Sequence, residues 1–249
     1  GIAGALAVDY NLNYYKNGWA WDTKMIGAFG INKNSDSEFA KKTDDRIEIN
    51  SLVGKNFTKE LSYSSFINFK TQFASGYKYS NSSTAAEQRT ETTRFFSPAY
   101  IQLGVGVYWK KSKDFWVNMA PVTGRLIIAN KKFTSNLGDR EEYFGISKGN
   151  TSRFELGASL TGFYKFELIE NVILEQSLSL YSDYLQNAEN IDVDYTISAF
   201  MKINDYLSTS LIMQCRYDDN AVKKVQLREV FGLAVTLDLL EIPSLISKI

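Results

Sequence analysis

Apolar and polar residues alternate along nearly the whole chain, and this period of two is the feature that most limits the possible folds. From Ile191 to Ile203 the odd-numbered residues are apolar, while Asp192 and Asp194 lie among the even-numbered ones. Successive side chains of a β-strand point to opposite faces, whereas a helix would spread these residues around its circumference. The same pattern recurs from Phe154 to Leu168 and from Leu207 to Tyr217. The alternation therefore predicts an all-β protein.

The predicted strands are long, and the connections between them are of two kinds. About eleven strands of roughly 11 to 16 residues are expected, whereas strands of soluble proteins average about 5 to 6. They start near residues 3, 19, 45, 61, 97, 115, 151, 172, 191, 207 and 222. Short turns alternate with long polar connections at 33–44, 80–94 and 131–150. Short turns at one end and long loops at the other are typical of an antiparallel up-and-down transmembrane β-barrel.

One strand carries a break in its alternation. Phe115, Val117 and Met119 share a face, but Leu126 needs a change of phase after Pro121. Proline cannot donate a hydrogen bond to a neighbouring strand and is common at bulges. The sequence therefore predicts a β-bulge at Pro121.

A soluble β-sandwich or ligand barrel is the alternative to a membrane barrel. The polar faces carry charges such as Arg153 and Glu155, which a dry sandwich core would hold only at high cost. Aromatic residues cluster near the short turns and again toward the long loops, as expected for girdles at both bilayer interfaces. No stretch approaches 18 consecutive apolar residues, so the sequence predicts no transmembrane helix. These features favour a barrel in a bacterial outer membrane.

Strand direction predicts one strand more than those visible. If the short turns are periplasmic, the first and last visible strands both run toward the periplasm. An even barrel with both ends in the periplasm then needs a further strand before Gly1, from this chain or another. We therefore expect a barrel of about twelve strands, with the visible part over residues 1–239. Residues 240–249 are predicted to form a C-terminal periplasmic tail, and the long loops are predicted to be extracellular.

Several segments resemble a family of Bacteroidota outer-membrane proteins that is catalogued only as a domain of unknown function. The segments are KKTDDRIEINSLVGKNF (41–57), NFKTQFASGYKY (68–79), SPAYIQLGVGVYWK (97–110), APVTGRLIIAN (120–130) and ENIDVDYTISAFMKINDYLS (189–208). The resemblance implies the barrel fold and the outer-membrane location. It also implies a Trp- and Gly-rich segment before the first strand, of which only residues 1–4 are seen here. The family has no assigned catalytic residues, so the resemblance implies no activity.

Charged residues of both signs are predicted to face the lumen. The principal ones are Lys24, Arg46, Glu48, Arg125, Arg153, Glu155, Glu175, Arg216 and Arg228. A selective pore usually favours one sign of charge, so this balance favours an ion-paired lumen over a conducting pore. The whole chain is balanced too, with 28 Lys and Arg against 28 Asp and Glu, which argues against nucleic-acid binding.

A cluster of carboxylates is predicted near the loop ends of three consecutive strands. Its members are Asp183, Asp192, Asp194 and Asp218. Carboxylate oxygens could hold Ca²⁺, but arginines and lysines in the same strands could instead pair with them. The cations nearby favour pairing, so no metal and no cofactor is predicted.

Polar residues also interrupt the predicted lipid face on the second to fourth strands. They are Thr23, Ser51, Lys55, Ser65 and Thr71. Polar groups are costly against lipid and tolerable against protein, so they could mark a face for docking a partner protein. Alternatively, they lie at the depth of the lipid headgroups.

The sequence gives little support for catalysis. Histidine is absent, and barrel phospholipases, lipid A deacylases and omptin-type proteases rely on one. The leading hypothesis is a non-enzymatic accessory barrel within a larger outer-membrane assembly, such as a protein-insertion or secretion machine. Its expected partners are outer-membrane lipid and other outer-membrane proteins. The alternative is a narrow passive channel for small solutes, suggested by small inward residues such as Gly104, Gly106 and Ser159.

Overall fold

The computed structural model describes residues 1–82, 85–138, 141–186, 188–218 and 222–235. Within them, eleven strands form one large sheet in which neighbours follow the order of the chain. These strands are β1 (Ile2–Lys16), β2 (Trp19–Lys33), β3 (Lys41–Asn56), β4 (Leu61–Thr71), β7 (Ala99–Lys110), β8 (Phe115–Ile128), β11 (Ser152–Ile169), β12 (Val172–Asp183), β13 (Ile191–Lys202), β14 (Leu207–Asp218) and β15 (Val222–Val235). The prediction of an all-β antiparallel up-and-down fold is confirmed. The predicted tail, 240–249, lies outside the described residues.

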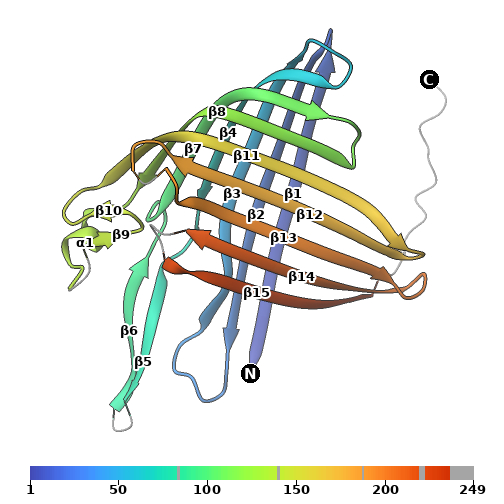
Figure 1. Ribbon diagram of the computed structural model, residues 1–249. Helices are drawn as coiled ribbons and strands as arrows, with labels where there is room; N and C mark the ends of the chain where they lie inside the picture. The colour runs from blue at the N-terminus through green and yellow to red at the C-terminus, as the bar shows by residue number, and fades with distance from the viewer. Residues whose placement is uncertain (83–84, 139–140, 187, 219–221, 236–249) are drawn as a thin grey trace, which may run out of the picture.

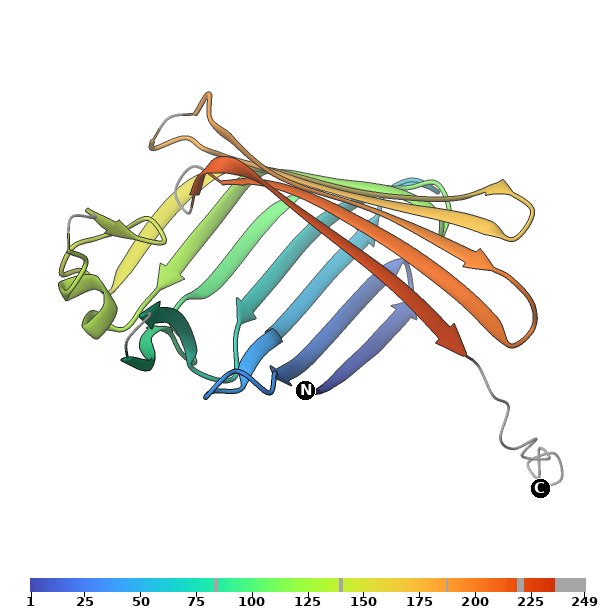
Figure 2. The same ribbon diagram turned by 90° about the horizontal axis from the view of Figure 1, so that it is seen from below.

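The sheet is strongly curved, and its two edges are β1 and β15 (Figures 1 and 2). Figure 2 shows β1–β4 on one side of the curved sheet and β12–β15 on the other. All neighbouring pairs are antiparallel, so the first and last of the eleven strands run in the same direction. Within the described residues, β1 and β15 are not paired with each other, and the sheet is open.

The loop end of the sheet carries additional structure that sequence analysis did not predict. The connection after β4 contains the hairpin β5 (Gly76–Ser82) and β6 (Ala85–Thr93). The connection after β8 contains the short helix α1 (Lys131–Ser135) and a small hairpin of β9 (Glu142–Tyr143) and β10 (Ile146–Ser147). Figure 1 shows α1, β9 and β10 together at one end of the sheet. The apolar residues of these segments are too irregularly spaced to give a strand or helix period.

The predicted bulge at Pro121 is confirmed. Val105 pairs with Val122 and Val107 pairs with Met119, so two residues of β8 oppose the single Gly106 of β7. A Cβ atom on Gly106 would lie 1.9 Å from the Met119 carbonyl oxygen, so glycine is required there. The bulge keeps apolar residues on the same face before and after Pro121.

On β4, β7, β8 and β11 the two faces of the sheet are buried in the opposite sense to those of a water-soluble sheet. Glu155 is 0% exposed and Asn118 is 2% exposed, and both lie on the polar face. On the apolar face, Leu103, Phe154 and Phe231 are 56%, 60% and 71% exposed. We call the polar face inward and the apolar face outward.

Within the described part of the chain, no helix combines the length and the apolar character needed to cross a membrane.

Candidate functional site

Five charged residues form a network on the inward faces of β8, β11, β12 and β13. Arg125 Nη1 donates to Asp192 Oδ2 at 2.6 Å and lies 3.3 Å from Glu155 Oε2. Arg153 Nε lies 3.0 Å from Glu155 Oε1, and its Nη2 lies 3.5 Å from Asp183 Oδ2. All five side chains are no more than 16% exposed. We call these residues the central network.

The central network connects strands that are not neighbours. Arg125 comes from β8 and Asp192 from β13, and β11 and β12 lie between them in the sheet. The Arg125 guanidinium also lies 3.6 Å from the centre of the Tyr181 ring on β12. Because the sheet curves, a long arginine side chain on one strand can reach a carboxylate three strands away. The network therefore fills space inside the curve of the sheet.

The four predicted calcium-binding carboxylates do not come together as a metal site. Asp183 and Asp192 belong to the central network, and Asp194 pairs with Arg216 at 2.6 Å. Asp218 is the last residue of β14. In the portion of the chain that the structure describes, no group of three Asp, Glu, Cys or His residues could hold a metal ion. Asp194 has a partner from the predicted group of strands, Arg216, whereas Asp183 and Asp192 pair with Arg153 of β11 and Arg125 of β8.

The other predicted lumen charges form ion pairs along the inward face. The pairs are Lys24–Asp9 at 2.8 Å, Arg46–Asp44 at 3.7 Å, Glu48–Lys70 at 3.3 Å and Glu175–Lys165 at 2.7 Å. Arg228 differs from them. It lies inward on β15, opposite Gln214, and forms no ion pair with another described residue.

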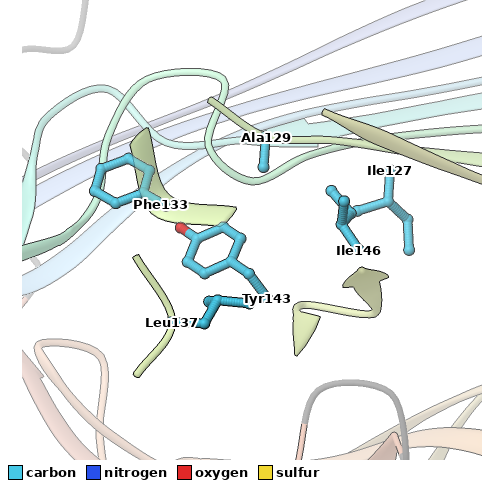
Figure 3. Close-up of a cluster of buried hydrophobic side chains, with 6 residues drawn as sticks. All are labelled: Ile127, Ala129, Phe133, Leu137, Tyr143 and Ile146. Atoms are coloured by element: carbon cyan, nitrogen blue, oxygen red, sulfur yellow. The ribbon is translucent and has the colours of Figure 1, made fainter. Parts of the chain in front are cut away.

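The segment after β8 folds against the inward face and has a small core of its own. The buried cluster comprises Ile127, Ala129, Phe133, Leu137, Tyr143 and Ile146 (Figure 3). Ile127, a member of this cluster, is an inward residue of the sheet. Its cross-strand partner Tyr100 is also inward and packs against the cluster. Arg153 of the central network donates to the Gly145 carbonyl oxygen at 3.1 Å. Residues 129–138 and 141–150 therefore cover part of the inward face at its loop end, and we call them the inner cap.

Glu91 on β6 joins the β5–β6 hairpin to the inner cap. Its carboxylate accepts hydrogen bonds from Arg94 Nη2 at 2.7 Å, Lys132 Nζ at 2.6 Å and Ser75 Oγ at 2.7 Å. These bonds, with that from Arg94 the most important, lower the pKa of Glu91 to about 2. Tyr143 Oη adds a hydrogen bond of 2.8 Å to the Thr92 carbonyl oxygen. Sequence analysis missed Glu91 because it lies in a connection without strand periodicity.

Two of the predicted docking residues are bonded to each other on the outward face. The hydroxyl groups of Thr23 and Ser51 lie 2.8 Å apart, and Trp21 Nε1 donates to Ser51 Oγ at 2.8 Å. Ser65 lies on the same face, opposite Val53 of β3 and Val105 of β7. The polar groups of Thr23 and Ser51 thus have partners within the wall.

The other two predicted docking residues lie near the ends of their strands. Thr71 is 5% exposed, and its hydroxyl donates to the Pro98 carbonyl oxygen at 3.1 Å. Lys55 Nζ donates to the Asn17 carbonyl oxygen at the short-turn end at 2.8 Å. The structure therefore does not bring the five residues together as one patch.

Glu229 is an outward charged residue that sequence analysis overlooked. It lies near the middle of β15, opposite Met213 of β14, and its side chain is exposed. Its neighbours on the same face of β15 are Leu227 and Phe231. A carboxylate within this apolar series could have been found from the period of two alone.

Comparison with known proteins gives one partial match. Residues 1–77 match the model of a family described as protein of unknown function (DUF3078). The expected similarity to a family of unknown function is thus confirmed for these residues, which include the 41–57 segment and most of the 68–79 segment. The other segments of the predicted resemblance lie outside the match. No curated protein and no solved structure is significantly similar to the chain.

Proposed function

We propose that this chain forms the wall of a transmembrane β-barrel in a bacterial outer membrane. The observation that carries the proposal is the inverted burial of the two faces on β4, β7, β8 and β11. An exposed apolar face costs free energy in water, at roughly 25 cal/mol per Å², and none against lipid. Charges such as those of the central network are stable inside a barrel because they have ion-pair partners there.

Aromatic residues on the outward face support a membrane-spanning position. At the short-turn end, the centroid of the Phe115 ring lies 5.2 Å from that of the Trp109 ring and 5.8 Å from that of the Tyr164 ring. At the loop end, the centroid of the Phe96 ring lies 5.5 Å from that of the Phe69 ring and 4.8 Å from that of the Phe95 ring. Two such bands are expected where amphipathic and aromatic rings meet the headgroup regions. In this proposal the short turns and the C-terminus are periplasmic, and the inner cap is extracellular.

The barrel closes through one more strand between β1 and β15 in this proposal. These two edges run in the same direction, so they cannot pair antiparallel with each other. One strand of opposite direction would pair with both and give an even number, about twelve in all. Its expected place in sequence is before Gly1, or in another chain.

Within this barrel, the role best supported is that of a non-enzymatic accessory subunit of a larger outer-membrane assembly. The inner cap and the central network occupy the inward side and leave less room for solute. Two small inward residues are also explained by packing. A Cβ on Gly104 would lie 2.5 Å from the Phe66 ring, and Gly106 accommodates the bulge. A barrel that is filled in this way is suited to support partners in the membrane.

The mass of the native particle tests the accessory role. The full-length protein is extracted from outer membranes in mild detergent, and the components of the particle are identified. A particle much heavier than the barrel subunit plus its micelle, with defined partner proteins, is expected. A lone barrel would refute the accessory role and leave the barrel itself in place.

The second candidate is a narrow passive channel for small solutes. It is favoured by a recess of about 360 Å³ at the short-turn end of the inward face. Its lining includes Tyr15, Asp22, Tyr108 and Lys110, so charges of both signs border the recess. Conductance across a planar bilayer distinguishes the two candidates, because a filled accessory barrel is expected to be silent.

A further inference from the structure

Two consecutive residues of the edge strand β15 carry opposite charges on opposite faces. Arg228 points inward and Glu229 points outward, as their partners Gln214 and Met213 show. Neither side chain forms an ion pair with another described residue, whereas inward charges such as Lys24, Glu48, Glu175 and Arg216 do so. The two unpaired charges therefore lie together at the free edge of the sheet.

The position of Glu229 makes its exposure to lipid unfavourable. It is six or seven residues from either end of β15, which is about 20 Å along the strand at about 3.3 Å per residue. A glutamate side chain cannot reach the headgroups from there. A charge on the lipid face costs most at the middle of the bilayer, and ionisable residues at that depth usually have a partner.

The direction of the edges limits what can provide these partners. An antiparallel occupant must run opposite to β15 and therefore also opposite to β1. A second copy in the same membrane orientation offers edges that run the same way as β1 and β15, so it could pair only in parallel. In the large sheet, each strand pairs with the strands before and after it in chain order. The same rule assigns the position beside β1 to a strand that is joined to β1 at the loop end.

We infer that the gap between β1 and β15 is filled by a strand of the same polypeptide that carries an adjacent pair of opposite charges. Opposite Arg228 this strand has an inward Asp or Glu, and opposite Glu229 it has an outward Lys or Arg. Directly opposed side chains of an antiparallel pair lie about 4.5–5.5 Å apart at Cβ, close enough for both ion pairs. The inference rests on the proposed membrane barrel and names the chemistry of its closing strand.

Photocrosslinking in the native membrane tests this inference directly. In the full-length protein, a photoreactive p-benzoylphenylalanine replaces Glu229 in one variant and Leu103 on β7 in a control variant. The expected Glu229 product is a crosslink to a peptide of the same polypeptide that contains adjacent basic and acidic residues. A crosslink to lipid alone, to another protein, or to a peptide without this charge pair overturns the inference. The Leu103 control tests the membrane barrel separately, because there a crosslink to lipid is expected.

The effect of Glu229→Leu on folding provides an independent measurement, because a paired and an unpaired Glu229 predict effects of opposite sign. If Glu229 is paired with a cation, Glu229→Leu lowers the ratio of folded to unfolded full-length protein in lipid vesicles by about threefold or more. If Glu229 faces lipid alone, the same substitution removes a charge from lipid and raises that ratio, which contradicts the inference. The outward Gln176→Leu on β12 is a control for the loss of a neutral polar group, since it removes the hydrogen bond from Tyr195 Oη at 2.9 Å but no charge. The two proposals are tested separately. If Leu103 crosslinks to lipid but Glu229 does not capture the expected peptide, or if Glu229→Leu raises the folding ratio, the inference about the closing strand is refuted and the membrane barrel is not.

Discussion

Glu155 is fully buried between two arginines, and this environment makes it the residue on which the central network depends. Its oxygens lie 3.3 Å from Arg125 and 3.0 Å from Arg153. The sequence was sufficient to predict that these residues face inward, because the period of two fixes the face. It could not predict that Arg125 would reach Asp192, since that contact depends on how strongly the sheet curves.

Replacing Glu155 by Gln is expected to lower the free energy of unfolding by about 3 kcal/mol, because two buried guanidinium groups lose a shared counter-charge. The matched control is Glu175→Gln. Glu175 also lies inward and pairs with Lys165 at 2.7 Å, but both side chains are about a third exposed. Its loss is expected to cost less than about 1 kcal/mol. Urea unfolding in lipid vesicles measures both values, and equal costs would contradict the central role of Glu155.

Gly104 is predicted to be required by packing rather than by passage of solute. Gly104→Ala would place its Cβ 2.5 Å from the Phe66 ring and 2.7 Å from Thr123 Oγ1, and is expected to cost about 1–3 kcal/mol. Adding Phe66→Leu should recover part of that cost, because it removes the obstructing ring. Gly162→Ala is the control, since its Cβ would be no closer than 3.7 Å to a neighbour. A double variant whose costs simply add would show that the ring is not the obstruction.

At the scale of elements, the inner cap depends on contacts between two loop segments that are far apart in sequence. Glu91 of β6 binds Lys132 of α1, 41 residues later. The strands of the wall could be predicted because each of them follows one regular period. The inner cap could not, since Phe133, Leu137, Tyr143 and Ile146 follow neither a period of 2 nor one of 3.6.

Replacing Glu91 by Gln is expected to increase hydrogen exchange in the inner cap by about tenfold or more at neutral pH, because hydrogen bonds to charged groups contribute roughly 1.5–3 kcal/mol. Glu142→Gln removes the same charge from the same cap, but at an exposed position of β9. It should leave the exchange rates nearly unchanged. If both variants exchange alike, Glu91 does not hold the cap.

The same contact gives the cap a defined dependence on pH. The pKa of Glu91 lies at about 2 in the folded protein, below its ordinary value of 4.5. A lowered carboxylate pKa stabilises the fold fully above the ordinary value, and this contribution is lost as the pH falls through about 2. Exchange rates of the unmodified protein and of Glu91→Gln should therefore differ above pH 4.5 and converge near pH 2. A constant difference over this range would contradict the assignment.

For the whole molecule, the difference between the two faces can be tested with a single pair of neighbouring residues. Leu178 lies outward on β12, opposite Tyr195, and Ser177 lies inward with an exposed side chain. Leu178→Arg is expected to cost about 2–4 kcal/mol of folding free energy in lipid vesicles, because arginine would face the hydrocarbon. Ser177→Arg should cost less than about 1 kcal/mol, since its charge stays on the polar side. A larger effect of Ser177→Arg would contradict the membrane barrel.

The open edges of the sheet also determine the order in which this molecule can fold. Each pairing within the large sheet joins strands that follow each other in the chain, and their hairpins can form locally and early. In the proposed barrel, the pairing that closes the gap between β1 and β15 is different, because β15 lies some two hundred residues after β1 and pairs last. Closure of the proposed barrel is then expected to be the slow step of folding, so that an unfinished molecule exposes the free edge of β15 for the longest time.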